Sequence, residues 1–168
     1  MERLWSPWRL PYITGAKDPQ DCLFCQAGTN AQEEALIVLR ASTSFVILNR
    51  FPYNNGHLMI APCRHVATLA GLTRDEAIEI MMLTQRAEIA LTEAYQPHGI
   101  NVGVNLGRPA GAGIVDHVHV HLVPRWNGDT NFMSVIGEVR VLPEALETTA
   151  ARLHPIFERL AKEPSVTP

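Results

Sequence analysis

Three histidines occupy alternate positions in one short segment, His117, His119 and His121, with valines between them. Alternation with a period of two is typical of a β-strand, so the valines should face a core and the imidazoles should share the opposite face. Imidazoles held side by side lose solvation and oppose each other's charge, which makes such a row costly unless it serves a site. Near neutral pH an imidazole can attack as a nucleophile, transfer a proton or bind a metal ion. The segment therefore predicts a site for one of these reactions, rather than the ordinary polar face of an amphipathic strand.

The loop before the histidines begins just after Asn105 and is rich in glycine, with Gly107, Gly111 and Gly113 among its residues. Glycine lets backbone N–H groups approach a ligand closely. Backbone donors, a side-chain amide and a row of imidazoles together suit a phosphate or a phosphoanhydride, which we expect the amides of Gly111 and Gly113 to bind. His119 has a histidine on either side, so it is the residue best oriented to act as a nucleophile.

A second group of reactive residues lies near the start of the chain, where Cys22 and Cys25 form a C-x-x-C pair with His65 downstream. Thiolate and imidazole are the preferred ligands of tetrahedral zinc, so a Zn²⁺ site is predicted here. The alternative is a pair of reduced cysteines in a loop. A thioredoxin-like redox pair is disfavoured because no βαβ pattern surrounds the motif.

Hydrophobic periodicity and turn residues divide the chain into short strands and two helices. The longest helix is predicted over Thr73–Tyr95, with a capping box formed by Thr73 and Glu76. A C-terminal helix is predicted over Pro143–Lys162, with a kink at Pro155. Strands are expected at Ala35–Leu39, Ser44–Leu48, His57–Ala61, Ile100–Leu106 and through the histidine segment. This order predicts an α+β domain with a mostly antiparallel sheet.

Length and composition restrict the possible classes of function. A chain of 168 residues with 46% hydrophobic and 18% charged residues is expected to form one globular domain. The net charge of −3 provides no basic surface for nucleic acid or for a membrane. With no apolar run of membrane length and no signal-peptide core at Met1–Leu10, we expect a cytoplasmic protein. We divide it into an N-terminal arm (1–21), a main domain (22–135) and a C-terminal helical extension of the same domain (136–168).

The run His-Val-His-Val-His-Leu-Val-Pro at 117–124 resembles the signature of the histidine triad (HIT) superfamily. The upstream run Phe45–Arg50, the turn ending at Gly56 and His57, and the long helix fall where that family has them. Leu4–Arg9 and Pro124–Phe132 further resemble the bacterial diadenosine tetraphosphate phosphorylase branch. The resemblance implies a HIT-like fold, with a mostly antiparallel five-stranded sheet, one long helix and a C-terminal helix.

The resemblance also implies roles for individual residues. His119 would attack the α-phosphorus and form a nucleotidyl-histidine, and His121 would support the phosphate and its developing charge. His57 would belong to the histidine network behind the nucleophile. Asn49 corresponds to the ribose-binding residue of the family, and Asn105 to a polar residue that contacts phosphate.

Zinc-containing members of the family bind the ion through a C-x-x-C pair, a histidine after the third strand and the first histidine of the triad. These residues correspond to Cys22, Cys25, His65 and His117. A structural Zn²⁺ is therefore expected, and no organic cofactor. Such an ion would fix His117 while leaving the nucleophile free.

The implied reaction is nucleotidyl transfer on dinucleoside polyphosphates, most simply phosphorolysis of diadenosine tetraphosphate to ATP and ADP. Many relatives carry Ser or Thr near the leaving group, where this chain has Gly113 and Ile114, which leaves the substrate open. The alternatives are a hydrolase of dinucleoside polyphosphates or nucleoside phosphoramidates, a metalloenzyme whose three histidines bind one ion, and a non-catalytic zinc-stabilised nucleotide-binding protein. A small-molecule nucleotide is the expected partner. A homodimer is expected from the relatives and from apolar residues of the long helix beyond one stripe, Ile78, Met81 and Met82.

Overall fold

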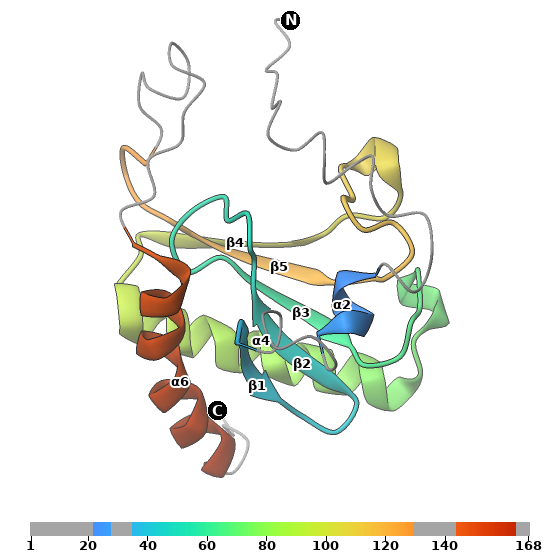
Figure 1. Cartoon of the computed structure of the whole chain (residues 1–168), viewed down its shortest axis with the longest axis horizontal. Helices are drawn as coiled ribbons and strands as arrows, with labels where there is room; N and C mark the ends of the chain where they lie inside the picture. The colour runs from blue at the N-terminus through green and yellow to red at the C-terminus, as the bar shows by residue number, and fades with distance from the viewer. Residues whose placement is uncertain (1–21, 28–34, 130–143, 164–168) are drawn as a thin grey trace, which may run out of the picture.

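The computed structural model of the chain describes residues 22–27, 35–129 and 144–163. The predicted arm (1–21), the motif Leu4–Arg9 and the end of the second motif, residues 130–132, lie outside the described residues. The described part has α+β architecture, with five strands and two long helices (Figure 1). None of its helices combines the length and apolar character that a membrane span requires.

The strands form one antiparallel sheet in the order β1-β2-β3-β5-β4. Their bounds are β1 Ile37–Arg40, β2 Ser44–Leu48, β3 Leu58–Pro62, β4 Gly99–Val104 and β5 Val120–Arg125. The first four lie within one or two residues of the predicted strand ends, and the five-stranded antiparallel sheet is confirmed. Strand β5, which contains His121, lies between β3 and β4, so the end of the histidine segment belongs to an interior strand of the sheet.

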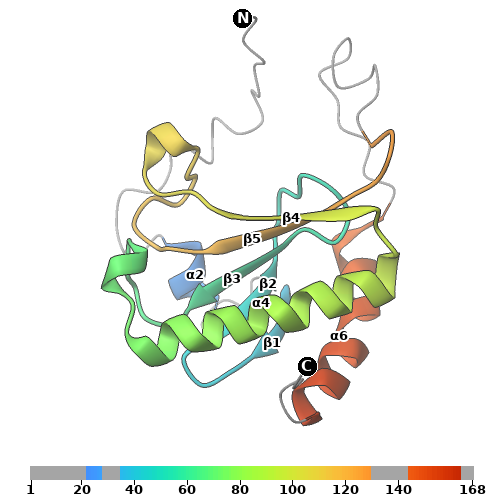
Figure 2. The same cartoon turned by 180° about the vertical axis from the view of Figure 1, so that it is seen from behind.

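One face of the sheet is covered by the long helix α4 (Arg74–Tyr95), which crosses β2, β3 and β5 (Figure 2). Leu83 and Leu91 are 1% and 0% exposed, and each burial stabilises the fold by about 1.5–3 kcal/mol. The predicted capping box is confirmed: the side chain of Thr73 accepts from the N–H of Glu76, and the Glu76 carboxylate accepts from the N–H of Thr73. The second helix, α6 (Leu146–Lys162), packs against α4 and β1 and contains Pro155.

The short helix α2 (Leu23–Gln26) lies on the opposite face of the sheet from α4, as Figures 1 and 2 show from the two sides. Its buried residue Phe24 packs against Phe45 of β2 and against the rings of His117 and His119. Two single turns of 3₁₀-helix, η3 (Leu69–Gly71) and η4 (Arg108–Ala110), lie in the loops before α4 and β5. The histidines therefore lie between the sheet and α2.

The histidine segment differs from the predicted regular strand. Strand β5 begins only at Val120, so His117 and His119 precede it in an irregular stretch, and both are almost completely buried. The pairing of β3 with β5 ends at Ile60 and Val120, two residues before Pro62. Proline has no N–H to donate, so Pro62 cannot extend this ladder, and the pairing of β4 with β5 also ends at Val120. The three imidazoles consequently lie in different surroundings rather than on one uniform face.

Candidate active site and metal site

His119 is held in one tautomer by the backbone. Its Nδ1 lies 2.8 Å from the carbonyl oxygen of His117. Because a carbonyl oxygen can only accept, Nδ1 carries the hydrogen, and Nε2 of the neutral ring keeps its lone pair. Burial lowers the pKa of His119, which favours this neutral form. The arrangement leaves one ring nitrogen able to act as a nucleophile or a base.

A second chain of hydrogen bonds sets the tautomer of His121. The backbone N–H of Tyr53 donates to Nδ1 of His57 at 3.0 Å, so His57 carries its hydrogen on Nε2. That Nε2 lies 3.0 Å from Nδ1 of His121 and donates to it. The neutral ring of His121 must then carry its own hydrogen on Nε2. Its ring centroid lies 4.7 Å from that of His119, so a donor stands beside the nucleophilic candidate.

The turn between β2 and β3 positions His57. The side chain of Asn49 accepts from the N–H of Phe51 and its amide nitrogen lies 3.3 Å from Nδ1 of His57. Gly56 has a φ of +73°, and a Cβ there would come within 3.0 Å of Tyr95 and 3.1 Å of Leu91. Only glycine fits this approach without strain. Asn49 thus supports the turn, and its predicted contact with a ribose stays a prediction.

The glycine loop offers fewer free amides than the sequence suggested. The N–H of Gly111 donates to the carbonyl of Arg108 at the end of η4, so it is not available to a ligand in this structure. Among the described residues, the N–H of Gly113 and the side chain of Asn105 have no hydrogen-bond partner. A Cβ on Gly111 would lie 3.8 Å from the amide nitrogen of Asn105, which shows how closely the loop approaches that side chain. Of the predicted phosphate-binding groups in this loop, the N–H of Gly113 and the side-chain amide of Asn105 therefore remain available to a ligand.

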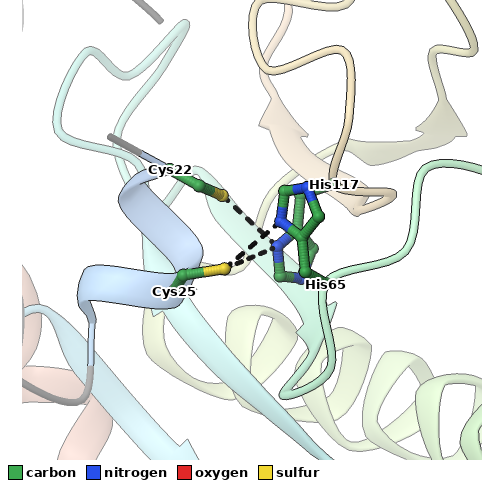
Figure 3. A group of neighbouring side chains, drawn as sticks. All are labelled: Cys22, Cys25, His65 and His117. Carbon is green, nitrogen blue, oxygen red and sulfur yellow. Dashed lines mark hydrogen bonds between the residues drawn. The ribbon is translucent and has the colours of Figure 1, made fainter. Parts of the chain in front are cut away.

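The four predicted metal ligands come together (Figure 3). Nδ1 of His117 lies 3.3 Å from Sγ of Cys22 and 3.6 Å from Sγ of Cys25, and Nδ1 of His65 lies 3.3 Å from Sγ of Cys25. Zinc–sulfur bonds of about 2.3 Å and zinc–nitrogen bonds of about 2.0–2.1 Å place tetrahedral ligands about 3.6 Å apart. The cluster has the spacing of such a site and could hold a metal ion.

The protonation of the cluster also suits a cation. Nε2 of His117 donates to the carbonyl oxygen of Pro62 at 2.8 Å, so Nδ1 presents its lone pair to the two sulfurs. Burial lowers the pKa of His117 to about 4, which keeps the ring neutral, as a metal ligand must be. Burial, with Cys22 beside it, raises the pKa of the Cys25 thiol to about 11. A bound cation would reverse that penalty by stabilising thiolate.

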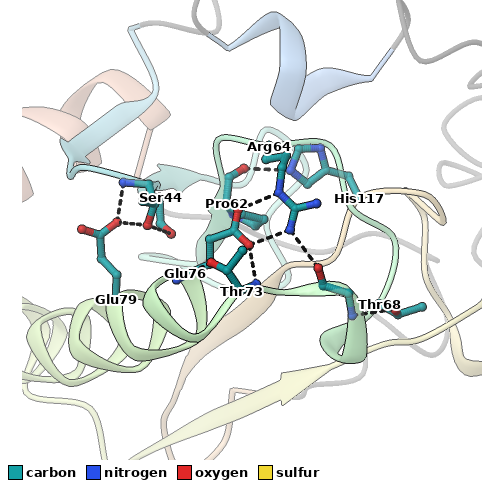
Figure 4. Close-up of polar contacts among 10 residues, drawn as sticks. Ser44, Pro62, Arg64, Thr68, Thr73, Glu76, Glu79 and His117 are labelled. Carbon is teal, nitrogen blue, oxygen red and sulfur yellow. Dashed lines mark hydrogen bonds and ion pairs between the residues drawn. The ribbon is translucent and has the colours of Figure 1, made fainter.

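The loop that carries His65 is tied to the start of α4 by a neighbouring ion pair (Figure 4). The Arg64 guanidinium donates to both oxygens of Glu76, at 2.9 and 2.7 Å, and to the carbonyl oxygen of Gly71 at 2.8 Å. The Glu76 carboxylate accepts at the same time from the N–H of Thr73. Sequence reasoning identified the capping role of Glu76 but missed Arg64, because only the folded loop brings them together.

Comparison with known proteins identifies the family. The family model described as the HIT domain matches residues 30–128. The AP-4-A phosphorylase of Mycobacterium tuberculosis is 41% identical over 157 residues, which cover 89% of this chain and 80% of that protein. This chain belongs to the HIT family. It is therefore a HIT-family enzyme with nucleotide-processing relatives.

Two further HIT proteins widen the comparison. The bis(5′-adenosyl)-triphosphatase of Dictyostelium discoideum is 29% identical over 128 residues, covering 73% of this chain and 85% of that protein. A crystal structure of a Zn-bound histidine triad family protein from Mycobacterium smegmatis superposes with a TM-score of 0.68 at 26% identity, covering 84% of this chain and 96% of that one. The HIT fold is thus shared with a relative whose structure contains zinc.

Proposed function

We propose that this HIT enzyme transfers a nucleotidyl group from a dinucleoside polyphosphate to inorganic phosphate through a covalent nucleotidyl-histidine on His119. The observation that carries the proposal is the hydrogen bond from Nδ1 of His119 to the carbonyl of His117, which leaves Nε2 unprotonated. The 41% sequence identity to the AP-4-A phosphorylase of Mycobacterium tuberculosis supports diadenosine tetraphosphate as the substrate. The products would then be ATP and ADP.

In the first step Nε2 of His119 attacks the α-phosphorus. A nitrogen–phosphorus bond forms, the bond from that phosphorus to the bridging oxygen breaks, and ATP leaves with the electron pair. The Nε2 hydrogen of His121 and the free amides of Gly113 and Asn105 donate to the phosphoryl oxygens, where negative charge is stabilised by donors already in place. Dividing one difficult displacement into two easier ones is the benefit of the covalent intermediate.

In the second step an oxygen of inorganic phosphate attacks the nucleotidyl phosphorus. The bond to Nε2 of His119 breaks, ADP leaves, and the imidazole returns to its starting tautomer. Gly113 carries no side chain where the resemblance to HIT relatives leads us to expect Ser or Thr. The absence of a side chain leaves room for an anion as large as phosphate next to the nucleotidyl group on His119.

We also propose that Zn²⁺ occupies the cluster formed by Cys22, Cys25, His65 and His117. When bound, the ion supplies a structural cross-link and stabilises the thiolates, with no contact to the reacting phosphorus. His117 links this site to the nucleophile, because its carbonyl oxygen holds the hydrogen of His119. The zinc-bound relative from Mycobacterium smegmatis supports the choice of metal.

The enzyme is a phosphorylase if phosphate accepts the nucleotidyl group from His119 and a hydrolase if water does. The purified enzyme is given diadenosine tetraphosphate with and without inorganic phosphate, and the products are separated by chromatography. We expect ADP only when phosphate is supplied, at a rate that saturates with its concentration. AMP and ATP at a rate independent of phosphate would instead identify a hydrolase, the activity named for the Dictyostelium relative. Rapid quenching with labelled substrate should trap the nucleotidylated chain in either case, whereas a binding protein would trap none.

A further inference from the structure

A groove of about 420 Å³ lies beside His121, on the face of the sheet that carries the histidines. Its volume falls within the range of about 300–1,000 Å³ that is usual for small-molecule pockets. The groove follows β5 from His121 to Arg125, a length of about 13 Å at about 3.3 Å per strand residue. It is lined along its length by Tyr53, Asn101, Gly103, Asn105, His121 and Arg125.

The entrance of the groove is open because β4 has no side chain there. Gly103 pairs directly with His121 across the two strands. Side chains of directly paired residues lie on the same face, so any side chain at position 103 would project beside the imidazole. A Cβ built on Gly103 would have no atom within 4 Å. A ligand that touches His121 can therefore continue along β5.

The polar groups of the groove carry little net charge. Arg125 donates to Oδ1 of Asp129 at 2.8 Å and to Oδ1 of Asn101 at 3.1 Å, so a carboxylate balances its charge. The amide nitrogen of Asn101 has no hydrogen-bond partner among the described residues. Neutral donors and acceptors of this kind suit the hydroxyls of a ribose and the edge of a base better than a bare polyphosphate.

The position of the groove relative to His119 indicates which part of a substrate reaches it. Phe24 covers His119 on one side, at 4.8 Å between ring centroids, and His121 borders it on another at 4.7 Å. In a phosphoryl displacement the attacking and leaving atoms lie roughly in line, so the leaving group points away from the nucleophile. A leaving group that departs past His121 enters the groove.

We infer that the groove binds the nucleoside of the leaving nucleotide, the half of the substrate that does not become attached to His119. This inference rests on the proposed function. Asn101 lies halfway along the groove, opposite Val123. It recognises that nucleoside, while Gly103 at the entrance keeps the path clear for the phosphates.

Binding to the His119→Ala variant tests the inference without turnover. Calorimetric titration compares diadenosine tetraphosphate with adenosine 5′-tetraphosphate, which lacks only the second nucleoside. We expect the dinucleotide to bind at least about tenfold more tightly, a difference of about 1.4 kcal/mol. Adding Asn101→Leu should abolish this preference. The same substitution at Asn127, an exposed asparagine outside the groove lining, is the matched control and should retain the preference.

Gly103→Val provides a second, position-specific test, since valine is favourable in a strand and meets nothing in the fold. It should weaken the binding of both ligands, with an unchanged melting temperature. A preference that survives Asn101→Leu, or no preference in the parent variant, overturns the inference. If His119→Ala binds neither nucleotide, the result contradicts the proposed function, and this inference, which depends on it, is contradicted as well.

Discussion

The backbone carbonyl of His117 accepts the Nδ1 hydrogen of His119 at 2.8 Å, while the ring of His117 faces Cys22 and Cys25. One residue thus belongs to both the metal cluster and the support of the proposed nucleophile. A change in the position of His117 within the cluster should therefore alter the hydrogen bond that sets the tautomer of His119. This connection leads to the first prediction.

Purified protein should contain about one Zn²⁺ per chain, and Cys22→Ser should lose it because thiolate ligands supply much of the affinity. Loss of the metal should lower the melting temperature and also kcat, although the ion does not touch substrate. Metal analysis, thermal denaturation and steady-state kinetics measure the three effects. Cys63→Ser is the control, since Cys63 is exposed and lies outside the cluster. Absence of metal from the wild type, together with a melting temperature unchanged by chelator, would contradict the prediction.

His119→Ala should reduce turnover by at least about a thousandfold while still binding nucleotide, as expected when the residue that forms an intermediate is removed. Labelled diadenosine tetraphosphate should no longer leave label on the quenched protein. His154→Gln, on α6, should behave as the wild type in both assays. Substantial turnover by His119→Ala would falsify the covalent mechanism.

His57 should act through His121 rather than on the substrate. His57→Phe retains a buried ring but removes the donor to His121. We expect a loss of about 10–100-fold in kcat, by analogy with the loss of a hydrogen-bonding partner behind a metal-ligating histidine. It also leaves the N–H of Tyr53 without its acceptor, which should destabilise the fold by about 1–3 kcal/mol. His57→Gln can replace part of both contacts, so its losses should be smaller. Equal activity in all three proteins would remove His57 from the network.

The sequence was most informative where a local rule applied. The capping box of Thr73 and Glu76 predicted the start of α4, and the period of two predicted the strands, because both patterns depend on neighbours in the chain. The start of β5 at Val120 was missed because it depends on both neighbouring strands: the pairing with β4 ends there, and Pro62 of β3 cannot donate a hydrogen bond.

The candidate site shows the same division between local and distant information. Residue types and spacing indicated the row of three histidines and the C-x-x-C pair with His65. The resemblance to the HIT family added His117 to the metal ligands and His57 to the histidine network. The tautomers of His57, His117 and His119 depend on hydrogen bonds to the backbone of Tyr53, Pro62 and His117. Residue types do not reveal such bonds, because a backbone carbonyl or N–H looks the same in almost every residue. The hydrogen bond from the N–H of Gly111 to the carbonyl of Arg108 could not be predicted for the same reason.

The chain is predicted to form a homodimer, because apolar side chains remain uncovered on α4 and on the edge strand β4. Met81 is 61% exposed on α4, and Val102 is 53% exposed on β4. Sedimentation at micromolar concentration should give twice the mass of the chain. Met81→Lys should shift the equilibrium towards monomer, whereas Glu88→Lys, an exposed charge on the same helix, should change it less. A monomeric wild type at that concentration would count against the prediction.

The contact between Arg64 and Glu76 should make stability depend on pH in an acid window. The hydrogen bond from Arg64, together with that from the N–H of Thr73, lowers the pKa of Glu76 from 4.5 to about 2. A carboxyl group whose pKa is depressed on folding stabilises the native state above its unfolded pKa. That stabilisation is lost as the pH falls from about 4.5 towards 2. Glu76→Gln keeps the capping geometry but loses the charge.

Urea denaturation of the wild type, Glu76→Gln and the exposed control Glu88→Gln over this window separates the contribution of Glu76 from those of other carboxylates. The wild type and the control should lose stability together, while Glu76→Gln starts lower at neutral pH and falls less steeply. Because Arg64 precedes His65, the same variant should bind zinc more weakly in competition with a chelator. Parallel curves for Glu76→Gln and Glu88→Gln would mean that the Arg64 contact contributes nothing to the acid dependence.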